Sequence, residues 1–213
     1  MRTDDLVELL ANGDVAVDAH APARRAAAAF ALAIVASFAL MAVVLGVQPD
    51  LAAEARQPMF WAKAAFALAL AVGGFAATHR LARPGVRLGA VPAALAVPLA
   101  AMWVLAAVTL LRAAPGERAA LFFGETWLSC PFSITLLAAP VFVAVLWALR
   151  GFAPTRLALA GAAAGLSAGA AGAAVYTLHC PELAAPFLGF WYVLGMLIPT
   201  ALGALIGPRV LRW

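Results

Sequence analysis

Long apolar stretches, separated by short polar connections, recur along nearly the whole chain. Six of them are about 18 to 24 residues long, enough to cross a hydrocarbon core of ~30 Å at ~1.5 Å per helical residue. They are Ala26–Val47, Phe60–Ala77, Leu88–Leu111, Phe132–Leu149, Leu157–Tyr176 and Phe187–Ile206. No strand-like alternation competes with the helical pattern. The pattern predicts an all-α, polytopic membrane protein built as a bundle of six transmembrane helices.

The composition supports a membrane protein. Of the 213 residues, 66% are hydrophobic and 11% are charged, whereas a soluble domain is nearer half apolar and a quarter charged. The first apolar stretch follows a polar, mostly acidic segment, so we expect a retained helix and no cleavable signal peptide. The chain divides into a cytoplasmic segment 1–25, a membrane domain 26–206 and a cytoplasmic tail 207–213.

The basic residues predict the orientation of the helices. If the six helices alternate in direction, ten of the fourteen basic residues fall on one side: Arg2, Arg24, Arg25, Arg80, Arg83, Arg87, Arg150, Arg156, Arg209 and Arg212. The remaining four are Arg56, Lys63, Arg112 and Arg118. Because cytoplasmic loops carry an excess of Lys and Arg, both chain ends are predicted to be cytoplasmic.

Lys63 is the one clear charge inside an apolar stretch, about one turn from its outer end. We expect its side chain to snorkel to the membrane interface. Ion and solute pathways usually place ionisable residues in the middle of spans, so the sparse charge argues against a transporter or channel. The sequence has no phosphate loop, zinc-protease motif or nucleophile elbow, and we predict that the protein is not an enzyme.

Glycine recurs at every fourth position in the fifth apolar stretch, at Gly161, Gly165 and Gly169. Small residues at this spacing form a flat face for close helix packing. We therefore expect this helix to be central and buried within the protein. A homodimer formed through the same face is the alternative that the pattern leaves open.

The segment before the first apolar stretch predicts a short amphipathic helix. Thr3 or Asp4 can cap its start, and Asn12-Gly13 would stop it. Leu6, Leu9 and Leu10 then share one face. A helix of about two turns is marginal in water, so this apolar face needs a partner.

Acidic residues indicate what that partner is. Asp4, Asp5 and Glu8 belong to the same helix, and anionic lipids attract basic helices, which disfavours binding to the membrane surface. A groove on a basic protein fits better. An ordinary solvated leader helix is the alternative.

The two cysteines are each followed by proline, and the predicted topology places both on the outer face. Three interpretations compete for Cys130 and Cys180: a structural disulfide, a reversible redox or thiol-reactive switch, and a metal site. The metal site would use His179, Cys180, Cys130 and Glu182, since thiolate and imidazole suit soft metals. Its spacing lacks the tight pattern of a typical zinc site. A catalytic disulfide exchanger is disfavoured, because the chain has no C-x-x-C motif and no second cysteine pair.

Three features together resemble the NrsF-like family of multi-spanning bacterial anti-sigma factors. They are the opening Arg2-Thr3-Asp4-Asp5-Leu6, the six apolar stretches, and the two sites Cys130-Pro131 and Cys180-Pro181. The resemblance implies a protein of the bacterial inner membrane that sequesters an extracytoplasmic-function sigma factor away from RNA polymerase. No direct nucleic-acid contact is expected. No cofactor is expected either, unless a metal binds at the cysteines.

The resemblance also implies roles for residues. Sigma binding falls to the N-terminal segment, with Asp4, Asp5, Leu6, Leu9 and Leu10 as the binding residues. Sensing of oxidative or thiol-reactive metal stress falls to Cys130 and Cys180. The N-terminal segment is short for masking a whole sigma factor, so we expect the inner loops around Arg80–Arg87 and Arg150–Arg156 to contribute. A transporter or channel, a membrane thiol oxidoreductase and a structural scaffold are the rival functions.

Overall fold

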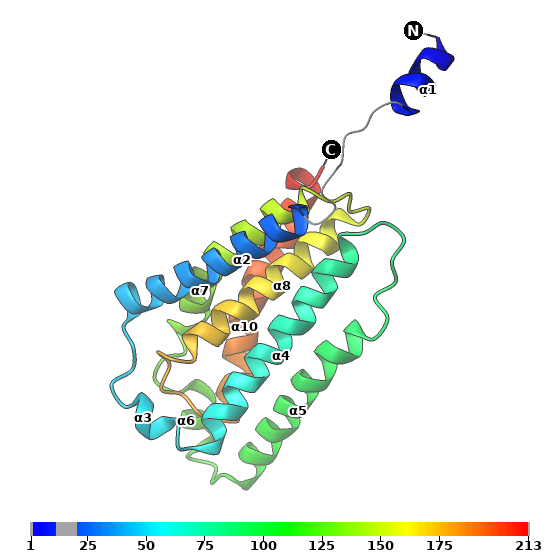
Figure 1. The fold of residues 1–213 in the computed structure, drawn as a ribbon. Coiled ribbons are helices and arrows are strands. Elements are labelled where there is room, and N and C mark those ends of the chain that lie inside the picture. Colours follow the sequence, from blue (N-terminus) through cyan, green and yellow to red (C-terminus); the bar gives the residue numbers. More distant parts are fainter. Residues whose placement is uncertain (1, 12–20, 213) are drawn as a thin grey trace.

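The computed structural model describes residues 2–11 and 21–212, which contain helices and connections but no strand (Figure 1). Its long helices are α2 (Ala21–Leu40), α4 (Pro58–Leu81), α5 (Val91–Arg112), α7 (Cys130–Leu149), α8 (Leu157–Tyr176) and α10 (Val193–Val210). The π-helical turn η1 (Met41–Leu45) extends α2, while α9 (Ala185–Phe187) and the π-helical turn η2 (Leu188–Tyr192) precede α10. The six resulting segments are long and apolar enough to cross a membrane. The predicted all-α bundle is therefore confirmed.

The bundle has two distinct ends (Figure 1). The short N-terminal helix α1 (Thr3–Ala11) and the C-terminus lie beyond one end, together with the connections 82–90 and 150–156. We call this the termini end. The opposite end carries α3 (Leu51–Glu54), α6 (Arg118–Phe123) and the connection 177–184. We call it the cysteine end, because Cys130 and Cys180 both lie there.

Proline marks the start of several helices. Pro58, Pro92, Pro131 and Pro186 each occupy the first or second position of a helix, where the missing N–H costs no hydrogen bond. As a result, α7 begins at Cys130 itself, two residues before the expected start of the fourth apolar stretch. This cysteine is thus held by a helix.

The central helix of the bundle is α8, most of whose residues are buried. Its three regularly spaced glycines face α10 at very short range. A Cβ atom at Gly161 would lie 2.0 Å from the backbone oxygen of Gly203, and one at Gly165 would lie 2.0 Å from the oxygen of Pro199. A Cβ atom at Gly169 would lie 2.9 Å from Met196. A homodimer through this glycine face would therefore have to displace α10.

The outer helices expose apolar side chains. Of the 22 residues of α5, only Val91 and Met102 are buried, and Leu111 on this helix is 78% exposed. On α2, Leu32 is 71% exposed, and Val43 in the η1 extension is 85% exposed. Monomeric soluble proteins rarely present apolar faces of this extent. These faces suit contact with hydrocarbon.

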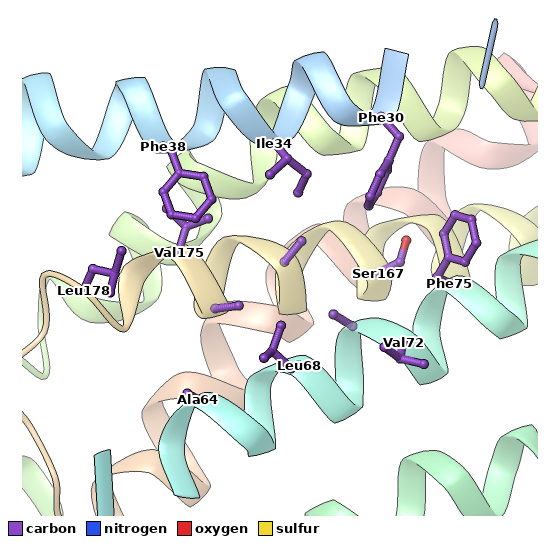
Figure 2. A pocket seen from close by; sticks show the side chains of 13 residues that line it. Phe30, Ile34, Phe38, Ala64, Leu68, Val72, Phe75, Ser167, Val175 and Leu178 are labelled. Carbon is purple, nitrogen blue, oxygen red and sulfur yellow. The ribbon is translucent and has the colours of Figure 1, made fainter. Parts of the chain in front are cut away.

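An apolar cavity of about 520 Å³ lies between α2, α4 and α8 (Figure 2). Phe30 and Phe75 contribute rings to its walls, with centroids 5.6 Å apart. The one polar side chain in its lining is Ser167, whose hydroxyl donates a hydrogen bond of 2.9 Å to the Ala164 carbonyl. No lining side chain therefore offers a free polar group, and the cavity suits hydrocarbon.

Candidate thiol site

Cys130 and Cys180 meet in one buried cluster at the cysteine end. The backbone N–H of Cys130 donates to the Thr126 carbonyl at 2.9 Å, and that of Cys180 donates to the Tyr176 carbonyl at 3.0 Å. Both side chains are fully buried, both are free thiols, and both belong to the same apolar cluster. The two thiols are close enough to interact electrostatically. The fold thus brings together two residues that are fifty positions apart in the sequence.

Two tyrosines flank the thiols. The rings of Tyr176 and Tyr192 are 5.8 Å apart, and both side chains are buried. The Tyr176 hydroxyl lies beside Cys130. The Tyr192 hydroxyl lies beside Cys180. Polar groups therefore border the thiols within an otherwise apolar cluster.

Lys63 of α4 lies fully buried beneath the connection 177–184. Its Nζ atom donates hydrogen bonds to the carbonyl oxygens of Cys180 at 2.7 Å and Glu182 at 3.1 Å. The same atom lies 5.7 Å from the centre of the Phe60 ring. The prediction that this side chain snorkels to the interface was wrong. It points toward the cysteine end, but two backbone carbonyls take the place of water around its ammonium group.

Glu182 joins the connection 177–184 to the connection 113–129. Its Oε1 atom accepts hydrogen bonds from the backbone N–H groups of Glu125 at 2.7 Å and Thr126 at 3.2 Å. Gly124 adopts a φ of 56°, and a Cβ atom there would lie 2.5 Å from the Glu182 carboxylate. Only glycine therefore leaves room for this carboxylate, which ties Cys180 to the turn that leads into Cys130.

The connection 46–57 closes the third side of the site. The His179 ring nitrogen Nδ1 lies 2.9 Å from the Gly46 carbonyl, which requires that this nitrogen carry a proton and donate. The Gln48 backbone N–H donates to the Leu178 carbonyl at 3.1 Å. The Gln48 amide also donates to one carboxylate oxygen of the buried Glu54. Three connections from distant parts of the sequence thus enclose the two thiols.

Aromatic side chains pack at the same end. The rings of Trp127 and Trp191 are 5.2 Å apart, and the Trp191 indole donates to the Phe122 carbonyl at 2.9 Å. Phe123 contacts both tryptophans, with ring centres 5.5 Å from Trp127 and 6.1 Å from Trp191. This packing connects α6 to the segment that begins the last long helix and restricts the access of water.

The proposed set of metal ligands does not form. Among the described residues, no group of three or more His, Cys, Asp or Glu side chains could hold a metal ion. His179 is engaged with the Gly46 carbonyl, and the carboxylate of Glu182 is engaged with backbone amides. The predicted arrangement of His179, Cys180, Cys130 and Glu182 as one ligating group is therefore corrected. The two thiols remain close to each other without the other two ligands.

Burial controls the ionisation of Cys180. It raises the pKa of this thiol above its ordinary value, while the nearby Lys63 ammonium acts in the opposite direction. The thiolate is the reactive form of cysteine, so a protonated, buried thiol reacts slowly. Reaction at Cys180 therefore requires the enclosing connections to open.

The N-terminal helix α1 lies beyond the termini end, apart from the thiol site (Figure 1). Asp4 and Asp5 are exposed, and a carboxylate oxygen of Asp5 accepts a hydrogen bond of 3.1 Å from the backbone N–H of Arg2. The side chains of Leu6, Leu9 and Leu10 fall outside the described part of the structure, as does the predicted stop at Gly13. The two groups of candidate residues thus lie at opposite ends of the molecule.

Sequence reasoning missed several components of the thiol site. Tyr176 and Tyr192 carry no sequence signal, because tyrosine is ordinary at the end of an apolar helix. Lys63 did carry one, as a lone charge in an apolar stretch. Its partners could not be found from the sequence, because they are backbone carbonyls in a connection 117 and 119 residues away.

The fold and the site define a polytopic helical protein that encloses a buried thiol pair at one end and carries an acidic helix at the other. The family model described as "NrsF: Negative regulator of sigma F" matches residues 10–213, and the chain belongs to this family. The chain is 52% identical over 213 residues to the "Probable anti-sigma-F factor NrsF" of Azospira oryzae, covering 100% of both chains. It is 40% identical over 218 residues to the "Anti-sigma-F factor NrsF" of Caulobacter vibrioides, again covering 100% of both. No solved structure matches. The resemblance noted from the sequence is confirmed.

Proposed function

We propose that this protein is a membrane-bound anti-sigma factor, a regulator and not an enzyme, that sequesters a sigma factor of the sigma-F type. The observation that supports this most directly is the full-length similarity to two proteins named as anti-sigma-F factors. More specifically, we propose that the sigma factor belongs to the extracytoplasmic-function class. Sequestration would keep it away from RNA polymerase.

The charge distribution supports a location in the bacterial inner membrane with both chain ends in the cytoplasm. Nine arginines of the bundle belong to the termini end: Arg24, Arg25, Arg80, Arg83, Arg87, Arg150, Arg156, Arg209 and Arg212. The acidic residues of residues 21–212 all belong to the cysteine end: Asp50, Glu54, Glu117, Glu125 and Glu182. Because cytoplasmic loops carry an excess of positive charge, this distribution supports a cytoplasmic termini end and a periplasmic thiol site.

The sigma factor binds the N-terminal segment. A sigma factor recognises DNA and therefore carries basic surface, which complements the exposed Asp4 and Asp5 on α1. Leu6, Leu9 and Leu10 would bury their side chains in a groove on that partner. Because α1 lies apart from the bundle (Figure 1), the sigma factor can approach this helix without entering the membrane.

The thiol pair is the sensor. With hydrogen peroxide as the oxidant, Cys130 and Cys180 each lose one hydrogen atom, a disulfide forms, and the hydrogen peroxide is reduced to two water molecules. A thiol-reactive metal ion would instead displace both thiol protons and bind the two sulfurs. Either reaction alters the contact between the start of α7 and the end of α8, and oxidation is the change that releases the sigma factor.

Close packing offers a route between the two ends. α8 runs from the thiol site to the termini end and contacts α10 along Gly161, Gly165 and Gly169 with no space for a side chain. A shift at one end of such a rigid pair is carried to the other. A coupling of about 1–3 kcal/mol changes affinity by about 5- to 150-fold, which suffices for a transcriptional switch.

A pull-down from detergent-solubilised membranes tests the proposal. We would compare the intact chain with a variant that lacks residues 2–12, and identify co-purifying soluble proteins by mass spectrometry. A sigma factor that binds the intact chain and is lost on truncation supports the proposal. A second variant carries Asp4→Asn and Asp5→Asn, which keep the helix and remove two of its three carboxylates, and it should bind the sigma factor more weakly. If no sigma factor is captured, or if truncation changes nothing, the proposal fails.

A further inference from the structure

The connections at the termini end of the bundle are rich in arginine. Within residues 21–212, the acidic residues all lie at the opposite, cysteine end. Positive charge on cytoplasmic connections needs no ligand to explain it. That rule does not explain why three of these arginines line one cavity.

This cavity, of about 490 Å³, lies between the connections 82–90 and 150–156. Arg83 and Arg87 line it from the first connection, and Thr155 and Arg156 line it from the second. All four side chains are exposed. The remaining lining residues are Leu81, Gly85, Val86 and Leu88. The cavity thus combines three positive charges and a hydroxyl with apolar walls.

The backbone around the cavity is held by its own hydrogen bonds. Gly85 turns the first connection with a φ of 75°. The Arg80 guanidinium donates to the Arg87 carbonyl at 3.0 Å, and a guanidinium nitrogen of Arg83 lies 3.4 Å from His79 Nε2. Arg80 thereby fixes the position of the residue that carries the second guanidinium of the cavity. The charged groups are presented on a shaped loop.

The chemistry of the lining selects a phosphate-bearing ligand. Guanidinium groups bind phosphate oxygens with paired hydrogen bonds, and a neighbouring hydroxyl adds a further donor. A soluble acidic protein would not need Leu81, Val86 and Leu88 beside the charges. The sigma factor is a poor candidate for this cavity, because a protein that binds DNA presents basic surface of its own. Any contribution of these two connections to sigma binding would have to come from residues outside the cavity.

The position of the cavity indicates which molecule supplies the phosphate. It lies where α4 and α8, two of the helices long and apolar enough to cross a membrane, end at the termini end. Lipid headgroups lie at that depth, and basic pockets between helices on the cytoplasmic side are known to bind anionic headgroups. We propose that the cavity lined by Arg83, Arg87, Thr155 and Arg156 binds the phosphate of an anionic phospholipid headgroup.

A bound headgroup would join the two connections. Arg83 and Arg87 follow α4, whereas Arg156 precedes α8, so one phosphate held between them links the cytoplasmic ends of both helices. The lipid would thereby stabilise the face of the membrane domain that lies beneath the sigma-binding helix. This consequence rests on the proposed function, whereas the binding of the headgroup rests only on the proposed orientation in the membrane.

Binding can be measured on the purified full-length chain in detergent, with dihexanoyl phosphatidylglycerol as the probe and dihexanoyl phosphatidylcholine as the uncharged comparison. The test variant carries Arg83→Gln, Arg87→Gln and Arg156→Gln. The matched control removes three charges from the same end but outside the cavity: Arg25→Gln, Arg209→Gln and Arg212→Gln. Inorganic phosphate at the same concentration distinguishes a lipid headgroup from a soluble anion.

We expect phosphatidylglycerol to bind the intact chain at least tenfold more tightly than phosphatidylcholine, and the test variant to lose about tenfold in affinity, as for one or two hydrogen bonds to a charged group. The control should stay within about twofold, because its charges lie outside the cavity. Equal losses in both variants would show general attraction to the charged end and overturn the proposal. Displacement of the lipid by equimolar phosphate would also overturn it, in favour of a soluble anion.

Two further outcomes remain decisive. If the triple variant does not fold, as judged by circular dichroism and gel filtration, the single variant Arg156→Gln in the exposed connection replaces it, with an expected loss of several-fold. If phosphatidylglycerol binds only after residues 2–12 are removed, the chain's own acidic helix occupies the cavity and the lipid proposal fails. Neither result depends on whether a sigma factor binds.

Discussion

The Nζ atom of Lys63 donates a hydrogen bond of 2.7 Å to the carbonyl oxygen of Cys180. This contact joins a long helix of the bundle to the short connection that carries the second thiol. A second hydrogen bond, to the Glu182 carbonyl at 3.1 Å, holds the same connection two residues further along. If the connection 177–184 moves, either these two hydrogen bonds break or the Lys63 side chain moves with it.

Replacing Lys63 by methionine should loosen the thiol site. Methionine fills similar volume but leaves the Cys180 and Glu182 carbonyls without their donor, which lowers the free energy of unfolding by about 1–3 kcal/mol. We expect a lower Tm in detergent and faster alkylation of Cys180 by N-ethylmaleimide. Arg56→Met, an exposed basic residue in the connection before α4, is the control and should change neither. Unchanged alkylation in Lys63→Met would show that the lysine does not hold the connection.

Gly124→Ala should displace the Glu182 carboxylate. The glycine has a φ of 56° and a ψ of −162°, a conformation that is strained for any residue with a Cβ atom, and that atom would collide with the carboxylate. We expect a loss of stability of about 1–3 kcal/mol. Gly116→Ala, a glycine of the same connection with no atom within 4 Å of the added Cβ, should change the Tm little. A similar Tm in both variants would argue against a stabilising role of the Glu182 carboxylate at this turn.

Gly161→Ala should disrupt the contact between α8 and α10. The added methyl group would lie 2.0 Å from the Gly203 backbone oxygen, and the two helices must separate to admit it. Overpacking of this kind costs about 1–3 kcal/mol, which thermal unfolding in detergent can measure. Gly151→Ala, where the nearest atom lies at 3.3 Å, serves as the milder comparison. If the two substitutions cost the same, the glycine contact is not a special feature of α8.

Alkaline pH should destabilise the protein through Cys180. Burial raises the pKa of this thiol in the folded state, so the unfolded chain loses the proton first, near the ordinary thiol pKa of about 8.5. Stability is complete below that pH and falls as the pH rises above it. The thiol is surrounded by Lys63, Glu182, Tyr192, Cys130 and Tyr176. We expect the Tm to fall less steeply between pH 8 and 10 in Cys180→Ser, whereas equal slopes would exclude this thiol as the cause.

Substitution of either thiol should abolish the response to oxidant. Cys130→Ser and Cys180→Ser each leave one sulfur, so no intramolecular disulfide can form, and we expect the sigma factor to stay bound after peroxide treatment. Co-purification before and after peroxide, with thiol trapping of the intact chain, checks this. Variants that release the sigma factor as the intact chain does would rule out the switch. Binding in the absence of oxidant should be unchanged in both.

The helical architecture could be predicted from the sequence because it depends on local composition. A run of about twenty apolar residues must satisfy its backbone hydrogen bonds internally when it crosses a bilayer, and a helix does this within one segment. Expected and observed helices differ at their ends. α4 reaches Leu81, beyond the expected end at Ala77, and α7 starts at Cys130, before Phe132. The four-residue spacing of Gly161, Gly165 and Gly169 likewise indicated a close contact but not which helix would fill it.

The sequence by itself determined the family, the six helices, the separation of charge between the two ends and the location of both cysteines at the same end of the bundle. Only the tertiary structure decided that Lys63 is buried, that Glu182 accepts hydrogen bonds from two backbone amides, and that Arg83, Arg87 and Arg156 line one cavity. The physical reason is the range of the interactions. Hydropathy and helix starts depend on neighbours in the chain, whereas the partners of these side chains come from connections far away in the sequence, which meet only when the helices pack.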